Sequence, residues 1–280
     1  MSPLIHLLTA CDQRCVFCSY PAERPVPEGG GLPSWVSALK TPGLVQVSGG
    51  EPLLADGDAL LRFVLYCAGR RRRVELQTNG VLLARLPETY FRRLVRAVGL
   101  SGGYFNVNFP SDSAAADLKI TRTRGAFAAR ARGVRRLIKA GAAVRLTHVI
   151  SSLNYRRLPA FVKFASARLK GVSWIQFSFI KAYGRSERGG FVPRYAEVSP
   201  YLIKALGLCR ERGLACETDH IPPCFLGEFA LSSVDAKKLS YGEKGRTMSE
   251  KAYVAACRGC RLRNICPGPR KDYIKVHRTL

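Results

Sequence analysis

The chain has 280 residues, of which 47% are hydrophobic and 9% aromatic, a composition that excludes an intrinsically disordered protein. No run approaches the roughly 18 apolar residues that a membrane-spanning helix needs, and residues 1–8 lack the basic leader and cleavage site of a signal peptide. We therefore expect a cytoplasmic protein with no membrane partner. The formal net charge of +25 would attract an anionic partner such as RNA, a nucleotide or an acidic peptide. Solvated helix faces in an Arg-rich composition explain the charge as simply, and we favour this interpretation.

Short apolar runs alternate with longer helical patterns along the chain. Strands are predicted at residues 5–8, 44–48, 74–78, 104–108, 143–150 and 174–179, and helices near residues 56–69, 86–98, 125–140, 155–168 and 199–212. Strands that alternate with helices indicate parallel βαβ units. Six such units predict an α/β fold, an open and partial (β/α)6 version of the TIM barrel, over residues 1–220. Its active site is expected at the carboxyl ends of the strands.

The regular pattern stops after about residue 220. Residues 221–280 contain little apolar material for a core of their own, yet they hold four cysteines at positions 224, 257, 260 and 266. A small piece of this kind needs another source of stability, and bound metal is one. We therefore expect a small C-terminal extension that binds a metal cluster.

The ten cysteines of the chain are unevenly placed. In a reducing cytosol, clustered cysteines bind metal more often than they form disulfides. Cys11, Cys15 and Cys18 have the spacing CxxxCxxC directly after the first predicted strand. Three thiolates so close together can hold three irons of a 4Fe-4S cluster and leave the fourth iron open; the spacing by itself also permits a zinc site with a fourth ligand elsewhere. Cys67 and Cys209 fall within helical patterns, and we predict that they are buried core residues.

This loop resembles the signature of the radical S-adenosylmethionine (radical SAM) superfamily. In that family the last cysteine follows an aromatic residue, here Phe17, and a GGE motif that binds the amino group of SAM ends the second strand. Further motif positions lie at the ends of the third and fourth strands, where the family contacts the ribose and carboxylate of SAM. The matching positions for the cofactor are Phe17, Gly49, Gly50, Glu51, Pro52, Thr78, Asn79, Asn106 and Asn108.

The glycines would let the backbone approach the ligand closely, and the acidic Glu51 would pair with an ammonium. The resemblance covers roughly residues 4 to 185. It implies that the reduced cluster cleaves SAM to methionine and a 5′-deoxyadenosyl radical, which abstracts hydrogen from the substrate, while the protein binds, orients and excludes water. It also implies an electron donor such as flavodoxin or ferredoxin.

The C-terminal cysteines resemble the SPASM and twitch extensions, which hold auxiliary 4Fe-4S clusters. No cysteine follows Cys266, so one auxiliary cluster is expected, as in the shorter twitch form. Cys257, Cys260 and Cys266 would be three of its ligands, and the fourth is Cys224 or Cys216. Four thiolates would also suit a structural zinc knuckle.

Tyr183 and His220 are candidate catalytic residues on the substrate side, because both fall near the expected barrel mouth. A structural polar role is the alternative for each. We rank a peptide or protein substrate, modified by crosslinking, epimerisation or oxidation, ahead of a small molecule or natural product, and both ahead of RNA or a nucleotide. The barrel begins almost at Met1, which counts against a self-sufficient peptide maturase, although a separate peptide-recognition protein could serve. The alternative of another class is a basic zinc protein that binds nucleic acid, in which residues 49–52 would have no role.

Overall fold

The computed structural model describes residues 3–20, 32–37, 39, 43–187, 190–242 and 248–278. Within these residues one parallel sheet runs in the order β1-β2-β3-β4-β5-β6-β7, so that β1 and β7 are its two edges and the barrel is open. The strands are β1 (Leu4–His6), β2 (Val45–Ser48), β3 (Val74–Thr78), β4 (Tyr104–Asn108), β5 (Val144–Ile150), β6 (Trp174–Phe179) and β7 (Cys216–Asp219). The predicted α/β fold and partial barrel are confirmed, with one strand more than predicted.

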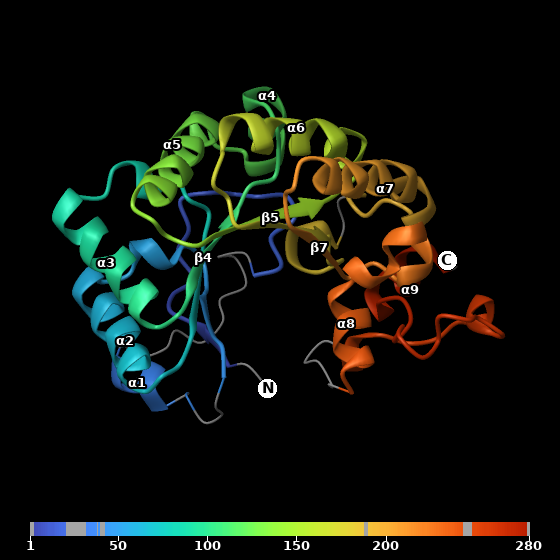
Figure 1. Ribbon diagram of the computed structural model, residues 1–280, viewed down its shortest axis with the longest axis horizontal. Helices are drawn as coiled ribbons and strands as arrows, with labels where there is room; N and C mark the ends of the chain where they lie inside the picture. Colours follow the sequence, from blue (N-terminus) through green and yellow to red (C-terminus); the bar gives the residue numbers. More distant parts are fainter. Residues whose placement is uncertain are drawn as a thin grey trace.

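Helices cover the outer side of the sheet as an arch, from α1–α3 at the left, over α5 and α6 at the top, to α7 at the right (Figure 1). They are α1 (Leu32–Ser37), α2 (Gly57–Gly69), α3 (Glu88–Leu100), α4 (Ala114–Thr121), α5 (Ala126–Lys139), α6 (Leu158–Arg168) and α7 (Tyr195–Glu211). The five predicted helices are α2, α3, α5, α6 and α7. No described helix is long and apolar enough to cross a membrane.

The strands present different residues on their two faces. Toward the helices they bury apolar side chains such as Val47, Leu76 and Phe105, all of them 0% exposed. Successive side chains of a strand point to opposite faces, so the inner face carries the intervening residues, and most of these are polar. Strands of a parallel sheet covered on both faces are normally apolar throughout. The alternation therefore shows that the inner face lines a polar interior.

The strand that sequence reasoning missed, β7, is short and polar. Its sequence is Cys-Glu-Thr-Asp, which has neither apolar alternation nor β-branched enrichment beyond Thr218. It is a strand because β6 offers a free edge, to which β7 pairs in parallel from Cys216 opposite Ile175 to Asp219 opposite Ser178. Tertiary pairing thus decides an element that local propensity does not.

The C-terminal segment packs against the barrel. It contains the 3-10 helices η5 (Pro223–Phe225), η6 (Gly227–Ser232), η7 (Met248–Glu250) and η8 (Ala255–Cys257) and the helices α8 (Val234–Ser240) and α9 (Lys271–His277). Tyr273 of α9 stacks on Tyr195 of α7, with ring centroids 3.8 Å apart, and the backbone N–H of Ala182 donates to Asp272 at 2.7 Å. Packing against the barrel therefore stabilises the extension, in addition to any bound metal. The division at residue 220 stays a prediction.

Candidate functional site

The cysteine loop follows β1 and is fixed by backbone hydrogen bonds to the end of α4. Arg14 N donates to Thr121 O at 3.1 Å, and Val16 N donates to Ile120 O at 2.9 Å. Inside the loop, Cys18 N donates to Cys15 O at 3.2 Å. The loop conformation therefore depends on α4, a helix that the sequence did not predict.

The three thiols of this loop lie within electrostatic reach of one another. Burial raises the pKa of Cys15 to about 12, and the neighbouring Cys11 and Cys18 add to the rise while Arg130 opposes it. Burial likewise raises the pKa of Cys11 to about 11. Thiolates rather than thiols bind metal, so metal binding here must displace protons. Among the described residues, no three Cys, His, Asp or Glu side chains converge on a point that would hold a single ion.

Gly49 and Gly50 are required because the cysteine loop crosses the end of β2 at very short range. A Cβ on Gly49 would lie 2.4 Å from Leu8 O, and one on Gly50 would lie 2.0 Å from Ala10 O. Gly50 N also donates to Leu8 O at 2.7 Å. The close approach seen here is that of the chain's own backbone; the predicted approach to a ligand stays a prediction.

Glu51 connects the ends of β2 and β3. Its carboxylate is fully buried and accepts hydrogen bonds from the Thr78 hydroxyl at 2.7 Å, Asn79 N at 2.7 Å and Leu53 N at 3.1 Å. Burial raises its pKa to about 7, although these hydrogen bonds lower it. The side chain is thus engaged by protein donors, and its predicted pairing with an ammonium stays a prediction. Pro52 begins the 3-10 helix η1 (Pro52–Leu54) directly after it.

Asn79 links the end of β3 to the cysteine loop. Its Nδ2 donates to Asp12 Oδ1 at 2.6 Å and lies 3.9 Å from Cys11 Sγ, while its Oδ1 accepts from Val81 N at 2.9 Å. Phe17 is partly buried against the hydrophobic core. The structure therefore brings the cysteine loop together with residues 49–52 and 78–79, as the motif order predicts, and adds Asp12 to the site.

A polar network that the sequence analysis missed crosses the inner face of the sheet. At its centre the buried carboxylate of Glu75 accepts from Arg145 Nη2 at 2.5 Å, Tyr104 Oη at 2.7 Å and Asn106 Nδ2 at 2.8 Å. Asn106 is thus held within the network, whereas Asn108 lies half-buried at the carboxyl end of β4. Polar residues at every second position of predicted parallel strands were the available signal.

The two predicted catalytic residues of the substrate side lie near the carboxyl ends of β6 and β7. Tyr183 is 45% exposed, with its ring centroid 5.8 Å from the Arg270 guanidinium. His220 is buried in the left-handed region at φ +66, and its Nδ1 is 3.3 Å from Asp219 Oδ1. Burial, followed by the charges of nearby Lys and Arg side chains, lowers the pKa of His220 well below its usual value. At neutral pH the ring therefore carries no charge.

Four C-terminal thiols gather into a second set. Burial raises the pKa of Cys224 to about 11, and Cys266, Cys260 and Cys257 add to the rise in that order. Cys216 lies elsewhere: its thiol is hydrogen-bonded to that of Cys209. Cys224 thus lies within electrostatic reach of the other three thiols, and its role as the fourth ligand stays a prediction. Cys67 and Cys209 are 0% exposed, which confirms that both are core residues.

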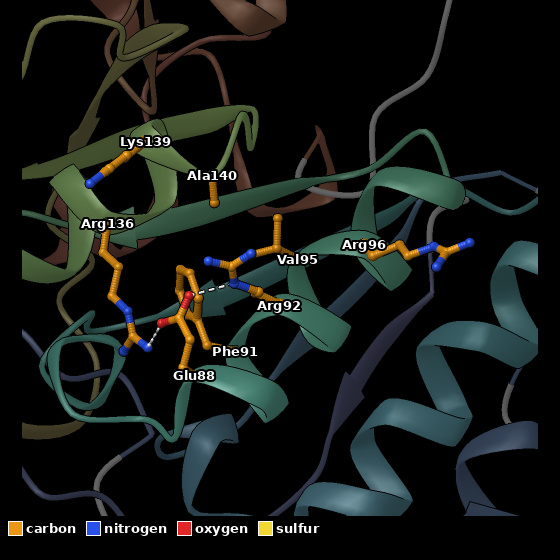
Figure 2. Close-up of a pocket in the computed structure, with 8 residues that line it drawn as sticks. All are labelled: Glu88, Phe91, Arg92, Val95, Arg96, Arg136, Lys139 and Ala140. Atoms are coloured by element: carbon orange, nitrogen blue, oxygen red, sulfur yellow. Dashed lines mark hydrogen bonds and ion pairs between the residues drawn. The ribbon is translucent and has the colours of Figure 1, made fainter.

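A cavity of about 580 Å³ lies between α3 and α5 on the outer side of the molecule. Figure 2 shows Glu88 between Arg92 and Arg136, with which it forms ion pairs of 2.6 Å each. Arg136 also stacks over the Phe91 ring at 4.0 Å. None of the predicted site residues lines this cavity, and its charges are partly neutralised within the protein, so it is separate from the cysteine loop.

Residues 5–165 match the family model described as the radical SAM superfamily. The chain belongs to the radical SAM superfamily. The prediction that it is an enzyme is thereby confirmed, and membership implies a 4Fe-4S cluster and SAM as cofactors. No curated protein matches the sequence.

Solved structures of radical SAM enzymes share the fold. SuiB of Streptococcus suis bound to S-adenosylmethionine aligns with a TM-score of 0.69 and 12% identity over 99% of this chain and 74% of that one. The structure of anSMEcpe with bound AdoMet and Kp18Cys peptide aligns with a TM-score of 0.61 and 17% identity over 77% of this chain and 63% of that one. HydG, the FeFe-hydrogenase maturase from Carboxydothermus hydrogenoformans, aligns with a TM-score of 0.60 and 14% identity over 83% of this chain and 58% of that one. In another SuiB structure the chain spans 48% of that chain's length. At these identities the likeness shows the fold alone.

Proposed function

We propose that Cys11, Cys15 and Cys18 hold a 4Fe-4S cluster whose fourth iron binds SAM. When bound, the cluster and SAM supply a 5′-deoxyadenosyl radical that takes a hydrogen atom from the substrate. The observation that carries the proposal is the presence of three thiols within electrostatic reach of one another on one loop, with family membership across residues 5–165. The buried amide Nε2 of Gln13, between two of these cysteines, has no hydrogen-bond partner among the described residues, which fits a bound group beside it.

The chain's own residues shape this site. Gly49 and Gly50 let the loop cross β2, and Glu51 holds the end of β3 at a fixed position against it. Asn79 then fixes the loop through Asp12. Because the thiols of Cys11 and Cys15 hold their protons at neutral pH in the absence of metal, cluster assembly releases protons and is favoured by higher pH.

We assign a peptide or protein as the substrate class. SuiB has been crystallised bound to the precursor peptide SuiA, and anSMEcpe with a bound peptide. In this chain the polar inner face, with its buried Glu75–Arg145 pair, supports a substrate with many hydrogen-bonding groups. Tyr183 and His220 are proposed to contact it from the ends of β6 and β7. A reductant such as flavodoxin or ferredoxin and a separate peptide-recognition protein are the proposed partners.

The second proposed cofactor is one auxiliary 4Fe-4S cluster on Cys224, Cys257, Cys260 and Cys266, within an extension formed by residues 221–280. The effect of the other three thiols on the pKa of Cys224 supports this ligand set. With four thiolates the cluster would have no open iron. That favours an electron relay over direct binding of substrate.

The test is 5′-deoxyadenosine formation by anaerobically reconstituted protein given SAM, a strong reductant and, in turn, peptide, small-molecule and RNA fractions of a host extract. Stimulation by the peptide fraction is expected; stimulation by another fraction alone would reassign the substrate class. Cys15→Ala should abolish SAM cleavage, because the open-iron cluster cannot assemble, whereas the core variant Cys67→Ala should keep it. Normal cleavage by Cys15→Ala would refute the cluster assignment.

A further inference from the structure

The guanidinium of Arg130 lies wholly inside the protein, next to the cysteine loop. Its side chain is 0% exposed, on the face of α5 that otherwise buries Ala126, Ala131 and Val134. A charge in such a place is costly unless it is paired and hydrogen-bonded. An apolar side chain would fill the same space on this face, so the charged group needs a separate explanation.

Each nitrogen of the guanidinium contacts a different segment. Nη1 forms an ion pair with Asp117 of α4, Nε donates to Asn79 O after β3 at 2.8 Å, and Nη2 donates to Gln13 Oε1 at 3.3 Å. Gly80 makes room for the stem of the side chain, since a Cβ there would lie 3.1 Å from Arg130 Cγ. The planar fork of arginine suits this three-way contact, which lysine could not reproduce.

Gln13 connects Arg130 to the cysteine loop. It is 3% exposed; its backbone N–H donates to Cys11 Sγ at 3.4 Å, and its Oε1 accepts from the Cys15 thiol at 3.5 Å. Because Arg130 donates to Oε1, the carboxamide is oriented with its NH2 group as the remaining donor. That group, Nε2, is buried and has no acceptor among the residues described. Leaving a buried donor unpaired destabilises the protein, and a bound acceptor would remove that cost.

We propose that Gln13 Nε2 donates a hydrogen bond to the cluster held by the cysteine loop, and that Arg130, fixed by Asp117, is the positioning residue that orients it. The inference rests on the proposed function of that loop. Hydrogen bonds to the sulfurs of an iron–sulfur cluster are among the factors that set its reduction potential. Loss of the Gln13 donor therefore lowers the midpoint potential of the SAM-binding cluster.

The experiment compares Gln13→Leu, Gln13→Glu, Arg130→Met and Arg130→Lys with the wild-type chain after anaerobic reconstitution. The readouts are iron per chain, the EPR spectrum of the reduced protein with and without SAM, and the midpoint potential of the signal that SAM alters. The matched control is Arg136→Met. Arg136 lies on the same helix and also donates to backbone carbonyls, Leu83 O and Leu86 O, but contacts no residue of the cysteine loop in the described structure.

Gln13→Leu and Arg130→Met are expected to shift the midpoint potential to more negative values, with Arg130→Lys between them and the wild type. Arg136→Met should lower thermal stability without moving the potential. If Gln13→Leu cannot retain iron, Gln13→Glu decides, because it keeps an oxygen that accepts from Arg130, loses the donor and adds a negative charge, and both of the last two changes lower the potential. A wild-type potential and spectrum in an iron-loaded Gln13→Glu protein would overturn the inference. A wild-type protein without any SAM-sensitive signal would instead defeat the proposed function.

Discussion

At the scale of single residues, the site depends on contacts between backbone and backbone. Gly50 packs against Ala10 O, and neither partner is a flexible side chain that could move aside. The same short contact brings the cysteine loop onto the end of β2. A glycine in the motif is therefore a requirement of the protein's own packing, whatever it also does for a ligand.

Gly50→Ala is expected to destabilise the fold by about 3 kcal/mol or more, because its Cβ would meet Ala10 O at 2.0 Å. Iron content should fall with it, since the cysteine loop must shift. The control is Gly99→Ala in α3, where a Cβ meets nothing within 4 Å; helix propensity predicts a gain of about 0.5–1 kcal/mol there. Thermal unfolding and iron analysis of both variants test this, and a Gly50→Ala protein as stable as wild type would contradict it.

At the scale of the elements, β5 shows how one strand serves two faces. Arg145 points to the polar interior, where it pairs with Glu75, while His148 packs into the helix layer against Phe161 with ring centroids 4.2 Å apart. A histidine can occupy either face of a strand of this kind. For His148, its Nδ1 hydrogen bond to Phe109 O, at 2.9 Å, and its full burial settle the question.

Burial lowers the pKa of His148 to about 4 from an unfolded value of 6.5. Between these pH values the unfolded chain binds the proton first, so this contribution to stability is present above pH 6.5 and is lost as the pH falls toward 4. The full loss is on the order of 3 kcal/mol.

His148→Phe should remove this dependence at the cost of one hydrogen bond, about 1 kcal/mol at neutral pH. Thermal unfolding at pH 7 and pH 5 is the measurement. An equal drop in melting temperature on acidification in both proteins would count against the assignment.

At the scale of the whole molecule, the C-terminal extension is joined to the barrel by an aromatic stack and by charges. Tyr273 and Tyr195 form the stack, and Glu250 of the extension pairs with Lys181 of the barrel at 3.5 Å. In Figure 1 the extension lies at the right-hand end of the arch, with α8 and α9 below α7. Its position relative to the cysteine loop is set by these contacts.

Tyr273→Ala should cost about 3–5 kcal/mol, because a large and fully buried ring is lost. Tyr273→Phe keeps the stack and loses only the hydrogen bond from Tyr195 N to the hydroxyl, so about 1 kcal/mol is expected. Limited proteolysis and thermal unfolding should separate the two variants. Equal stability of both would show that the stack does not hold the extension.

Cys260→Ala should leave the SAM-dependent EPR signal in place and remove about half the iron. Cys224→Ala should do the same, whereas Cys216→Ala should keep the full iron content, because its thiol faces Cys209. Iron analysis of the three reconstituted variants decides the fourth ligand. Iron loss in Cys216→Ala with none in Cys224→Ala would reverse the assignment.

Sequence by itself determined the parallel α/β fold and the six predicted strands, because both follow from the local alternation of apolar runs with helical patterns. It also determined the cysteine loop, the motif at residues 49–52 and hence the family, because those residues are close neighbours along the chain. Tertiary structure alone decided that β7 is a strand and that Arg130 reaches Gln13. In each of these cases the deciding contact joins residues far apart in the chain, and a pairing or a buried charge depends on what the fold places opposite it.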